Sequence, residues 1–253
     1  MKQPGIDGPR ACTQADLPGV ISVADAALRE GSNQTFLTDY PLVYRPANLA
    51  NVSILKVDGQ VVSVVPFIPW QVVVNDCRFS LGIIFPTATA PQHRKKGYGL
   101  QCLNRSVGKM MADGVNLSIL WTLIPTFRFY EHADYQGVHT ENCGYDCSLE
   151  DSSLFTDHGE KVIEYNPQSQ QYIDDVQVIH EQEPYGALRP NESYAVLLSL
   201  PKMKTLLALR DGKPTAYLVF SRAPNKPGVV ESGGNPEALQ DVAAPCAEFA
   251  DSR

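Results

Sequence analysis

The sequence predicts an α+β fold: a mixed, mostly antiparallel sheet flanked by helices, followed by a second and smaller half. Two Asp-Gly pairs, Asp58-Gly59 and Asp211-Gly212, each separate two apolar runs and indicate tight β-hairpins. Each hairpin follows segments with apolar residues at helical spacing and precedes a further strand. This recurring order suggests a duplicated unit, so we expect two domains, residues 1–149 and 150–253.

The first half opens with a predicted helix at residues 17–29, with Asp16 at the N-cap position and Pro18 in the first turn. The hairpin strands are expected at residues 52–57 and 61–67, and a third strand at 78–85.

A second helix of the first half is indicated by the apolar face of Leu100, Leu103, Val107 and Met110, and Gly114 is its C-terminal cap. The run at residues 117–122 (LSILWT) is almost wholly apolar and predicts a strand in the buried middle of the sheet.

The second half follows a polar connection at residues 150–159. We expect a strand at 161–165, helices at 171–180 and 194–200, hairpin strands at 205–210 and 215–222, and a last strand at 228–231. A Gly-rich turn then leads to Asn235 as a helix cap, with Pro236 in the first turn. This half lacks an Arg-x-x-Gly-x-Gly motif; the spacing in the first half would place a copy near Ala247.

Composition excludes some classes of function. The chain has 253 residues, of which 43% are hydrophobic, as in globular proteins. Its formal net charge of −7 argues against nucleic acid as the main partner and favours a cationic small molecule or peptide. The most apolar stretch, residues 61–74, is interrupted by Pro66, Pro69 and Gln71, so no membrane partner is expected.

The cysteines and the N-terminus indicate a cytoplasmic protein. Residues 1–14 lack the apolar run of a signal peptide, and the 6 cysteines are scattered, as is typical of reduced thiols. Cys143 and Cys147 have no second pair to complete a zinc site, so no metal is expected.

The motif with the clearest chemistry is Arg94-x-x-Gly97-x-Gly99, which lies between a predicted strand and a predicted helix. The first N–H groups of a helix point toward the incoming loop and can bind an anion. Glycines let a phosphate approach the main chain, and Arg94, Lys95 and Lys96 add positive charge. The motif therefore predicts a pyrophosphate site, although a solvated charge run is the alternative.

Two segments resemble motifs of the GNAT N-acetyltransferase superfamily. Residues 87–100 (TATAPQHRKKGYGL) resemble its acyl-coenzyme-A signature, V-x-P-x-x-R-x-x-G-x-G. Residues 129–135 (FYEHADY) resemble its F-Y-E-x-x-G-F segment, with Asp134 where the family usually carries Gly. The resemblance covers roughly residues 15–140 and implies a GNAT catalytic domain at 1–149, with a degenerate or partial GNAT-like domain at 150–253.

The resemblance implies roles for named residues, with acetyl-coenzyme A as co-substrate. Backbone amides of residues 94–100 would hold the pyrophosphate, and the irregular strand end at 86–89 would hold the pantetheine arm and polarise the thioester carbonyl. Tyr130 would protonate the departing thiolate. The implied coenzyme-binding residues are Thr87, Ala88, Thr89, Arg94, Lys95, Lys96, Gly97, Tyr98, Gly99 and Leu100.

The resemblance thus implies an acetyl-coenzyme-A-dependent N-acetyltransferase acting on a primary amine of a small molecule or peptide, and a homodimer is compatible with it. The base that deprotonates the amine stays open among Asp39, Asp76, Glu131, Glu141 and a water chain. Tyr130 could instead be a core aromatic, while His93 and His132 are interpreted as surface or capping residues. The alternative function is a non-catalytic acyl-coenzyme-A sensor or scaffold.

Overall fold

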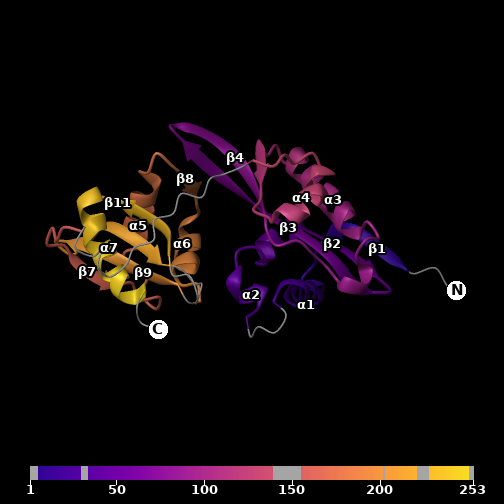
Figure 1. Ribbon diagram of the computed structural model, residues 1–253, viewed down its shortest axis with the longest axis horizontal. Helices are drawn as coiled ribbons and strands as arrows, with labels where there is room; N and C mark the ends of the chain where they lie inside the picture. The colour runs from indigo at the N-terminus through magenta and orange to yellow at the C-terminus, as the bar shows by residue number, and fades with distance from the viewer. Residues whose placement is uncertain (1–4, 30–33, 139–154, 202, 221–227, 251–253) are drawn as a thin grey trace. The chain divides into compact units, whose positions relative to one another are not determined.

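A computed structural model describes residues 5–29, 34–138, 155–201, 203–220 and 228–250. The chain divides into two compact units (Figure 1). The first unit comprises residues 1–72 and 78–140, and the second comprises 73–77 and 141–253.

The sheet of the first unit is mixed and mostly antiparallel, as predicted. Its strands lie in the order β1 (Ile6–Ala11), β2 (Val52–Val57), β3 (Gln60–Val74), β4 (Cys77–Ile84) and β6 (Leu117–Ile119) (Figure 1). β2 pairs antiparallel with both β1 and β3, whereas β4 and β6 are parallel. A two-residue strand, β5 (Ala88–Thr89), pairs with β3.

The helices of the first unit are α1 (Leu17–Leu28), α2 (Phe36–Asp39), α3 (Tyr98–Ala112) and α4 (Phe127–Glu131), with 3-10 turns η1 (Pro46–Asn51), η2 (Pro91–His93) and η3 (Ile124–Thr126). The apolar face of α3 forms the core with the sheet: Cys102, Leu103 and Met110 pack with Leu55, Val65 and Phe67. The helical face predicted from the sequence is therefore the face that is buried, and it anchors the start of α3 against the strands.

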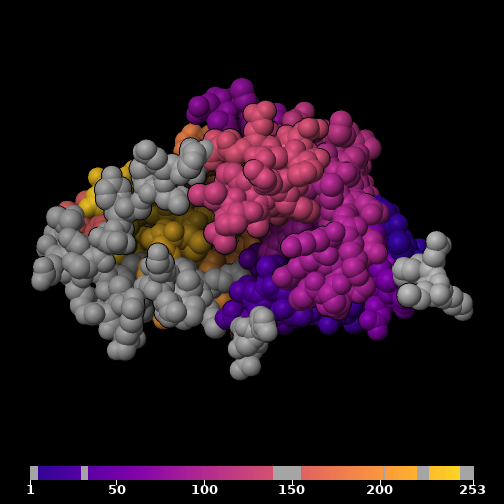
Figure 2. Space-filling view, turned by 45° about the vertical axis from the view of Figure 1, so that its right-hand side comes forward, coloured from indigo at the N-terminus to yellow at the C-terminus, as the bar shows by residue number. Residues whose placement is uncertain are grey.

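Two features of the first unit differ from the prediction. β1 was not predicted, because Gly8 and Pro9 interrupt its apolar pattern. The strand expected at residues 117–122 is only three residues long and lies at the end of the strand order, with Leu117 51% exposed and Trp121 78% exposed. Its apolar character therefore does not mark a central strand, and Figure 2 shows this part of the chain, in pink, at the molecular surface.

The second unit has an antiparallel sheet in the order β11 (Val229–Gly234), β10 (Lys213–Phe220), β9 (Lys204–Arg210) and β7 (Lys161–Glu164). Successive residues of β9 face opposite sides. Leu206 and Ala208 pack with α7 (Pro236–Ala250), whereas Leu207 and Leu209 pack with α5 (Ile173–Glu181) and α6 (Asn191–Leu198). The predicted smaller second half is thus a sheet covered by helices.

The spacing of the first half, which would place a copy of the motif near Ala247, does not carry over to the second half. In the first unit α3 follows the hairpin strands and the strands after them, and in the second unit α7 follows β11. The turn that precedes α7 is therefore Gly234-Asn235, and not the region of Ala247. The reason is strand length: β10 and β11 have 8 and 6 residues, whereas β3 and β4 have 15 and 8.

A buried polar network adds to the apolar packing of the second unit. Arg189, which follows β8 (Tyr185–Leu188), binds both carboxylate oxygens of Glu231 at 2.9 and 2.5 Å. Tyr217 donates its hydroxyl to Glu231 at 2.9 Å and also contacts His180 Nδ1 at 2.9 Å. The neighbouring Arg189 guanidinium helps to keep the pKa of Glu231 below its usual value, although burial alone would raise it. This network ties β8 and α5 to the sheet.

A buried carboxylate performs the same role in the first unit. Asp16 occupies the N-cap position of α1, but its carboxylate does not cap the helix. It binds Arg10 Nη1 at 2.7 Å and Lys56 Nζ at 3.0 Å, and its side chain is 3% exposed. Hydrogen bonds from Arg10 hold the pKa of Asp16 well below its usual range. One carboxylate thus links β1, β2 and α1.

We predict that Asp16→Asn lowers the free energy of unfolding by about 3 kcal/mol, because the two partly buried cations lose the buried carboxylate that pairs with both. Since the pKa of Asp16 is lowered on folding, its contribution is complete above the ordinary Asp pKa of about 3.9 and decreases as pH falls further. Urea unfolding between pH 7 and pH 3 measures both effects, and the difference between wild type and variant should shrink at pH 3.

Asp7→Asn is the matched control, because Asp7 binds the same Arg10 but its side chain is 51% exposed. Its cost should stay under about 1 kcal/mol. Equal losses in the two variants would show that burial of Asp16 does not matter.

Candidate functional site

The candidate site begins where β4 is interrupted. The parallel pairing of β4 with β6 ends at Ile83 and Ile119. The Phe85 N–H still donates to the Pro66 carbonyl of β3 at 3.0 Å, and pairing with β3 resumes at β5, where Thr89 faces Ser63. Between these points Pro86 and Thr87 form an irregular segment; the resemblance implied one at residues 86–89, but Ala88 and Thr89 belong to β5. The interruption leaves room beside β5 for a ligand.

The loop from β5 to α3 has a conformation that directs backbone N–H groups toward one place. Lys95 and Gly97 both have positive φ angles, 59° and 80°, so the chain twice enters the left-handed region. Gly97 is the N-cap residue of α3, and no side chain caps this end. Helix geometry leaves the N–H groups of Tyr98, Gly99 and Leu100 without an acceptor inside the helix.

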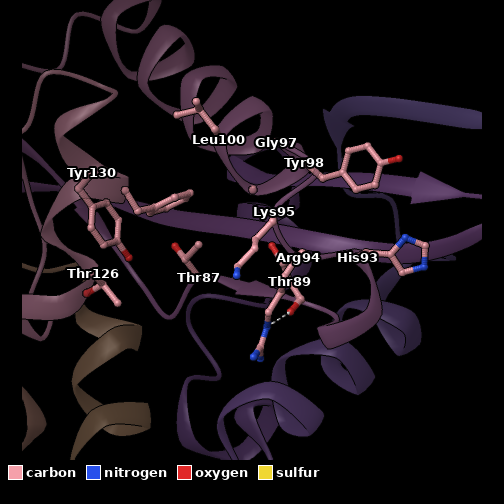
Figure 3. Close-up of a pocket in the computed structure, with 12 residues that line it drawn as sticks. Thr87, Thr89, His93, Arg94, Lys95, Gly97, Tyr98, Leu100, Thr126 and Tyr130 are labelled. Atoms are coloured by element: carbon pink, nitrogen blue, oxygen red, sulfur yellow. Dashed lines mark hydrogen bonds between the residues drawn. The ribbon is translucent and has the colours of Figure 1, made fainter.

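A cavity of about 470 Å³ lies at this helix start (Figure 3). Its lining comes from the irregular strand, the loop, the start of α3 and the region of α4: Thr87, Thr89, His93, Arg94, Lys95, Gly97, Tyr98, Gly99, Leu100, Thr126, Phe129 and Tyr130. Arg94 donates Nε to the Thr89 carbonyl at 3.2 Å, so its guanidinium is held against β5 (Figure 3).

The structure brings together most of the residues that the sequence predicted. Nine of them line the cavity, and Ala88 and Lys96 do not. Ala88 is 3% exposed and its carbonyl accepts a hydrogen bond from Ser63 Oγ at 3.3 Å, so its side chain is buried beside β3. Lys96 is exposed to solvent. The sequence missed His93, Thr126 and Phe129 as lining residues; His93 adjoins the motif, but Thr126 and Phe129 reach the cavity only through the fold.

The tyrosines near α4 have different environments. Tyr135 shares a hydrogen bond of 2.5 Å with Ser118, and burial raises its pKa. Tyr130 lines the cavity and packs edge-on against Phe129, with ring centroids 4.9 Å apart. Tyr130 is therefore the tyrosine of this segment that faces the candidate site. Asp134 adopts a φ of 62°, the left-handed conformation that glycine favours, so the turn after α4 keeps its geometry despite the substitution.

The residues around α3 fit the pyrophosphate of coenzyme A. A Cβ at Gly99 would lie 3.0 Å from Thr89 Oγ1 and 3.3 Å from Phe129 Cε2, so glycine fits this tightly packed position without displacing either side chain. The first turn of α3 has no acidic residue, and Arg94 and Lys95 line the cavity. Free amides and cations are the groups that bind a diphosphate.

The second unit offers a contrast at the start of α7. Asn235 Oδ1 accepts the N–H groups of Glu237 and Ala238 at 2.8 and 3.3 Å. The Gly234 N–H donates to Glu183 Oε1 at 2.9 Å. These amides are engaged by the protein's own side chains, and two of the residues near them are acidic. The start of α7 therefore does not fit an anion, whereas the start of α3 does.

None of the described carboxylates proposed as a base lines the cavity. Asp39 is buried and binds Arg29 Nη2 at 2.5 Å, whereas Asp76 and Glu131 are exposed. Glu141 lies outside the described residues.

The described part of the chain also bears on metal binding. There, no group of three or more His, Cys, Asp or Glu side chains could hold a metal ion, and Cys143 and Cys147 lie outside it. Among the helices of the same ranges, none combines the length and apolar character needed to cross a bilayer.

Comparison with protein families gives one match, to the acetyltransferase (GNAT) domain, over residues 9–138. The matched range includes the irregular strand, the loop, α3 and α4, and so contains the whole lining of the cavity. No curated protein matches the sequence significantly.

Solved structures with the same fold include a conserved protein of unknown function from Enterococcus faecalis V583, described as a probable N-acyltransferase, with a TM-score of 0.70 and 15% identity over 100% of this chain. GCN5-related N-acetyltransferases from Kribbella flavida and Anabaena variabilis ATCC 29413 give TM-scores of 0.67 and 0.65, with 16% and 14% identity over 98% of this chain. The chain covers 64%, 62% and 63% of these three proteins, a little under two thirds of their length.

Two glycines of α3 provide a test of the cavity geometry. Gly108 is exposed and a Cβ there would meet no atom within 4 Å, so Gly108→Ala should stabilise the protein by about 0.5–1 kcal/mol. Gly99→Ala should instead be neutral or destabilising, because its Cβ meets Thr89 and Phe129. Urea unfolding measures both.

The same clash predicts a coupling. Gly99→Ala should cost less in a Thr89→Ala background, because the nearest atom has been removed. Equal stabilisation by alanine at the two glycines would contradict the close packing at Gly99.

Proposed function

The chain belongs to the GNAT acetyltransferase family, and on that premise we propose that it is an acetyl-coenzyme-A-dependent N-acetyltransferase acting on a primary amine of a small molecule or peptide. Residues 1–149 would form the catalytic domain. Residues 150–253 would form a degenerate second GNAT-like unit without a coenzyme site, which agrees with the capped and acidic start of α7.

One observation carries the proposal: the uncapped start of α3 shares a cavity with two cations and a tyrosine hydroxyl. The amides of Tyr98, Gly99 and Leu100 would bind the pyrophosphate, together with Arg94 and Lys95. The irregular segment at Thr87 would hold the pantetheine arm, because it presents main chain that β6 does not pair.

When bound, the coenzyme supplies an acetyl thioester and a thiol leaving group. The chain's part is to orient these groups and to provide a proton. Tyr130 lies on the side of the cavity where Thr87 lies (Figure 3), and a phenol hydroxyl placed there can act as a general acid toward a thiolate.

The acceptor is proposed to be cationic in solution, since the chain has a formal net charge of −7. No nucleic acid or membrane partner is proposed. A cytoplasmic location and a homodimer stay predictions from the sequence.

A second candidate is a non-catalytic sensor or scaffold that binds acyl-coenzyme A. It is favoured by the lining of the cavity, which contains no carboxylate among the described residues. Calorimetric titration with acetyl-coenzyme A, followed by an assay of thiol release over a panel of primary amines, separates the two. Binding with amine-dependent thiol release supports the enzyme, and binding without it supports the sensor.

We predict that Tyr130→Phe lowers kcat by about 100-fold, because the general acid is lost while the ring and its packing are kept. The Kd for acetyl-coenzyme A should change by less than about twofold, since a single hydroxyl away from the phosphates contributes little to binding. Thiol release and calorimetry measure the two quantities.

Tyr135→Phe is the matched control, because its hydroxyl binds Ser118 and does not line the cavity. It should lower stability by about 1 kcal/mol and leave kcat largely unchanged. An unchanged rate in Tyr130→Phe would remove Tyr130 from the mechanism.

A further inference from the structure

A second cavity, of about 560 Å³, lies within the second unit and has no part in the proposed function. One wall is a single face of α5, because its residues recur at the helical spacing of three, four and seven positions: Asp175, Val178, Ile179 and Gln182. The facing wall comes from the start of β10 and from the turn before α7. The cavity is therefore a trough that runs along the length of α5.

The lining of this trough carries negative charge at two separate places. Asp175 lies in the first turn of α5, and Glu183 lies just beyond the last helical residue, Glu181. The helix rise of about 1.5 Å per residue places the backbones of Asp175 and Glu183 roughly 12 Å apart. This spacing fits two separate positive charges better than one compact ion.

Both carboxylates have free capacity for a ligand. Neither of them is in an ion pair within the described ranges of the chain. Glu183 accepts the Gly234 N–H through Oε1 at 2.9 Å, which fixes the side chain and leaves Oε2 for another donor. The described lining contains no Lys, Arg or His, and a cleft lined by charge of one sign concentrates ions of the opposite sign.

The trough is apolar between the two carboxylates. Val178 and Ile179 lie on the α5 wall between Asp175 and Glu183, and Pro214 lies on the facing wall. Val178 is 54% exposed, so its aliphatic side chain stays in contact with water. Because covering apolar surface is favourable, a chain of methylene groups suits this middle section.

We propose that this trough binds a linear aliphatic polyamine. One terminal ammonium group binds Asp175, the other binds Glu183, and the methylene chain lies against Val178 and Pro214. The site shares no lining residue with the cavity at the start of α3 and does not depend on the proposed function. The second unit thereby has a ligand of its own, of opposite charge to the diphosphate proposed for the first.

Calorimetric titration of the full chain with three probes tests this: 1,8-diaminooctane, putrescine and Mg²⁺. The two diamines have the same charge and differ in length, and Mg²⁺ carries that charge in one compact ion. Wild type is compared with Asp175→Asn and Glu183→Gln, and Gln can still accept the Gly234 N–H. Asp174→Asn is the matched control, because Asp174 shares the first turn of α5 but does not line the trough. Thermal unfolding of each variant establishes that it is folded before titration.

The expected pattern depends on length as well as charge. Wild type should bind 1,8-diaminooctane about tenfold more tightly than putrescine, because only the longer chain reaches both carboxylates and one hydrogen bond to a charged group has about that effect. Asp175→Asn and Glu183→Gln should each weaken the longer diamine by about tenfold and remove its advantage over putrescine. Asp174→Asn should match wild type.

Several outcomes would overturn the proposal. If putrescine or Mg²⁺ binds wild type as tightly as 1,8-diaminooctane, the trough is only a region of negative charge. An equal loss in Asp174→Asn leads to the same conclusion. Binding that Asp175→Asn and Glu183→Gln both retain unchanged belongs to another part of the chain. If 1,8-diaminooctane does not bind wild type, the site does not exist, whereas the proposed function is still decided by the titration with acetyl-coenzyme A.

Discussion

The site depends on one constraint: the first amides of a helix need acceptors, and for α3 no side chain of the described residues caps them. Gly97 at the N-cap has no side chain, and the first turn contains no acid. The helix is nevertheless stable because its opposite face is buried, with Cys102 and Leu103 fully inside the core. Tertiary packing therefore maintains a helix start that an isolated helix would leave frayed, and the unsatisfied amides stay available to an anion.

In the second unit a helix also starts after a strand and a glycine turn, but its first amides are capped. There, α7 also follows a strand through a glycine turn, but Asn235 and Glu183 satisfy its first amides from within. Capping of this kind stabilises a helix by about 1 kcal/mol and removes its capacity to bind anions. The comparison indicates that the fold alone does not determine a phosphate site. The side chain at the N-cap and the charge beside it decide between stability and binding.

The sequence predicted the fold class and most of the cavity because the relevant signals are local. Asp58-Gly59 fixes a hairpin by its own backbone preferences, and Gly97 and Gly99 mark a loop before an amphipathic helix. It failed where three-dimensional context decides. The apolar run at residues 117–122 lies at an edge, and Phe129 reaches the cavity only because α4 packs beside α3, which no spacing rule gives. The sequence predicted Asp16 as a helix cap, but in the structure its carboxylate pairs with Arg10 and with Lys56, which is 40 residues away in the sequence.

The contents of the cavity also define a division of chemical roles. Its lining has cations, hydroxyl groups and main-chain amides, which stabilise negative charge and give up protons. It has no described carboxylate that could take a proton from an ammonium group. Under the proposed function, an acceptor amine would therefore lose its proton to water, to His93 or to a group outside this lining, and not to a carboxylate of the lining. On that proposal, the groups that line this cavity bind the donor and supply a proton, and activation of the acceptor is a task for other groups.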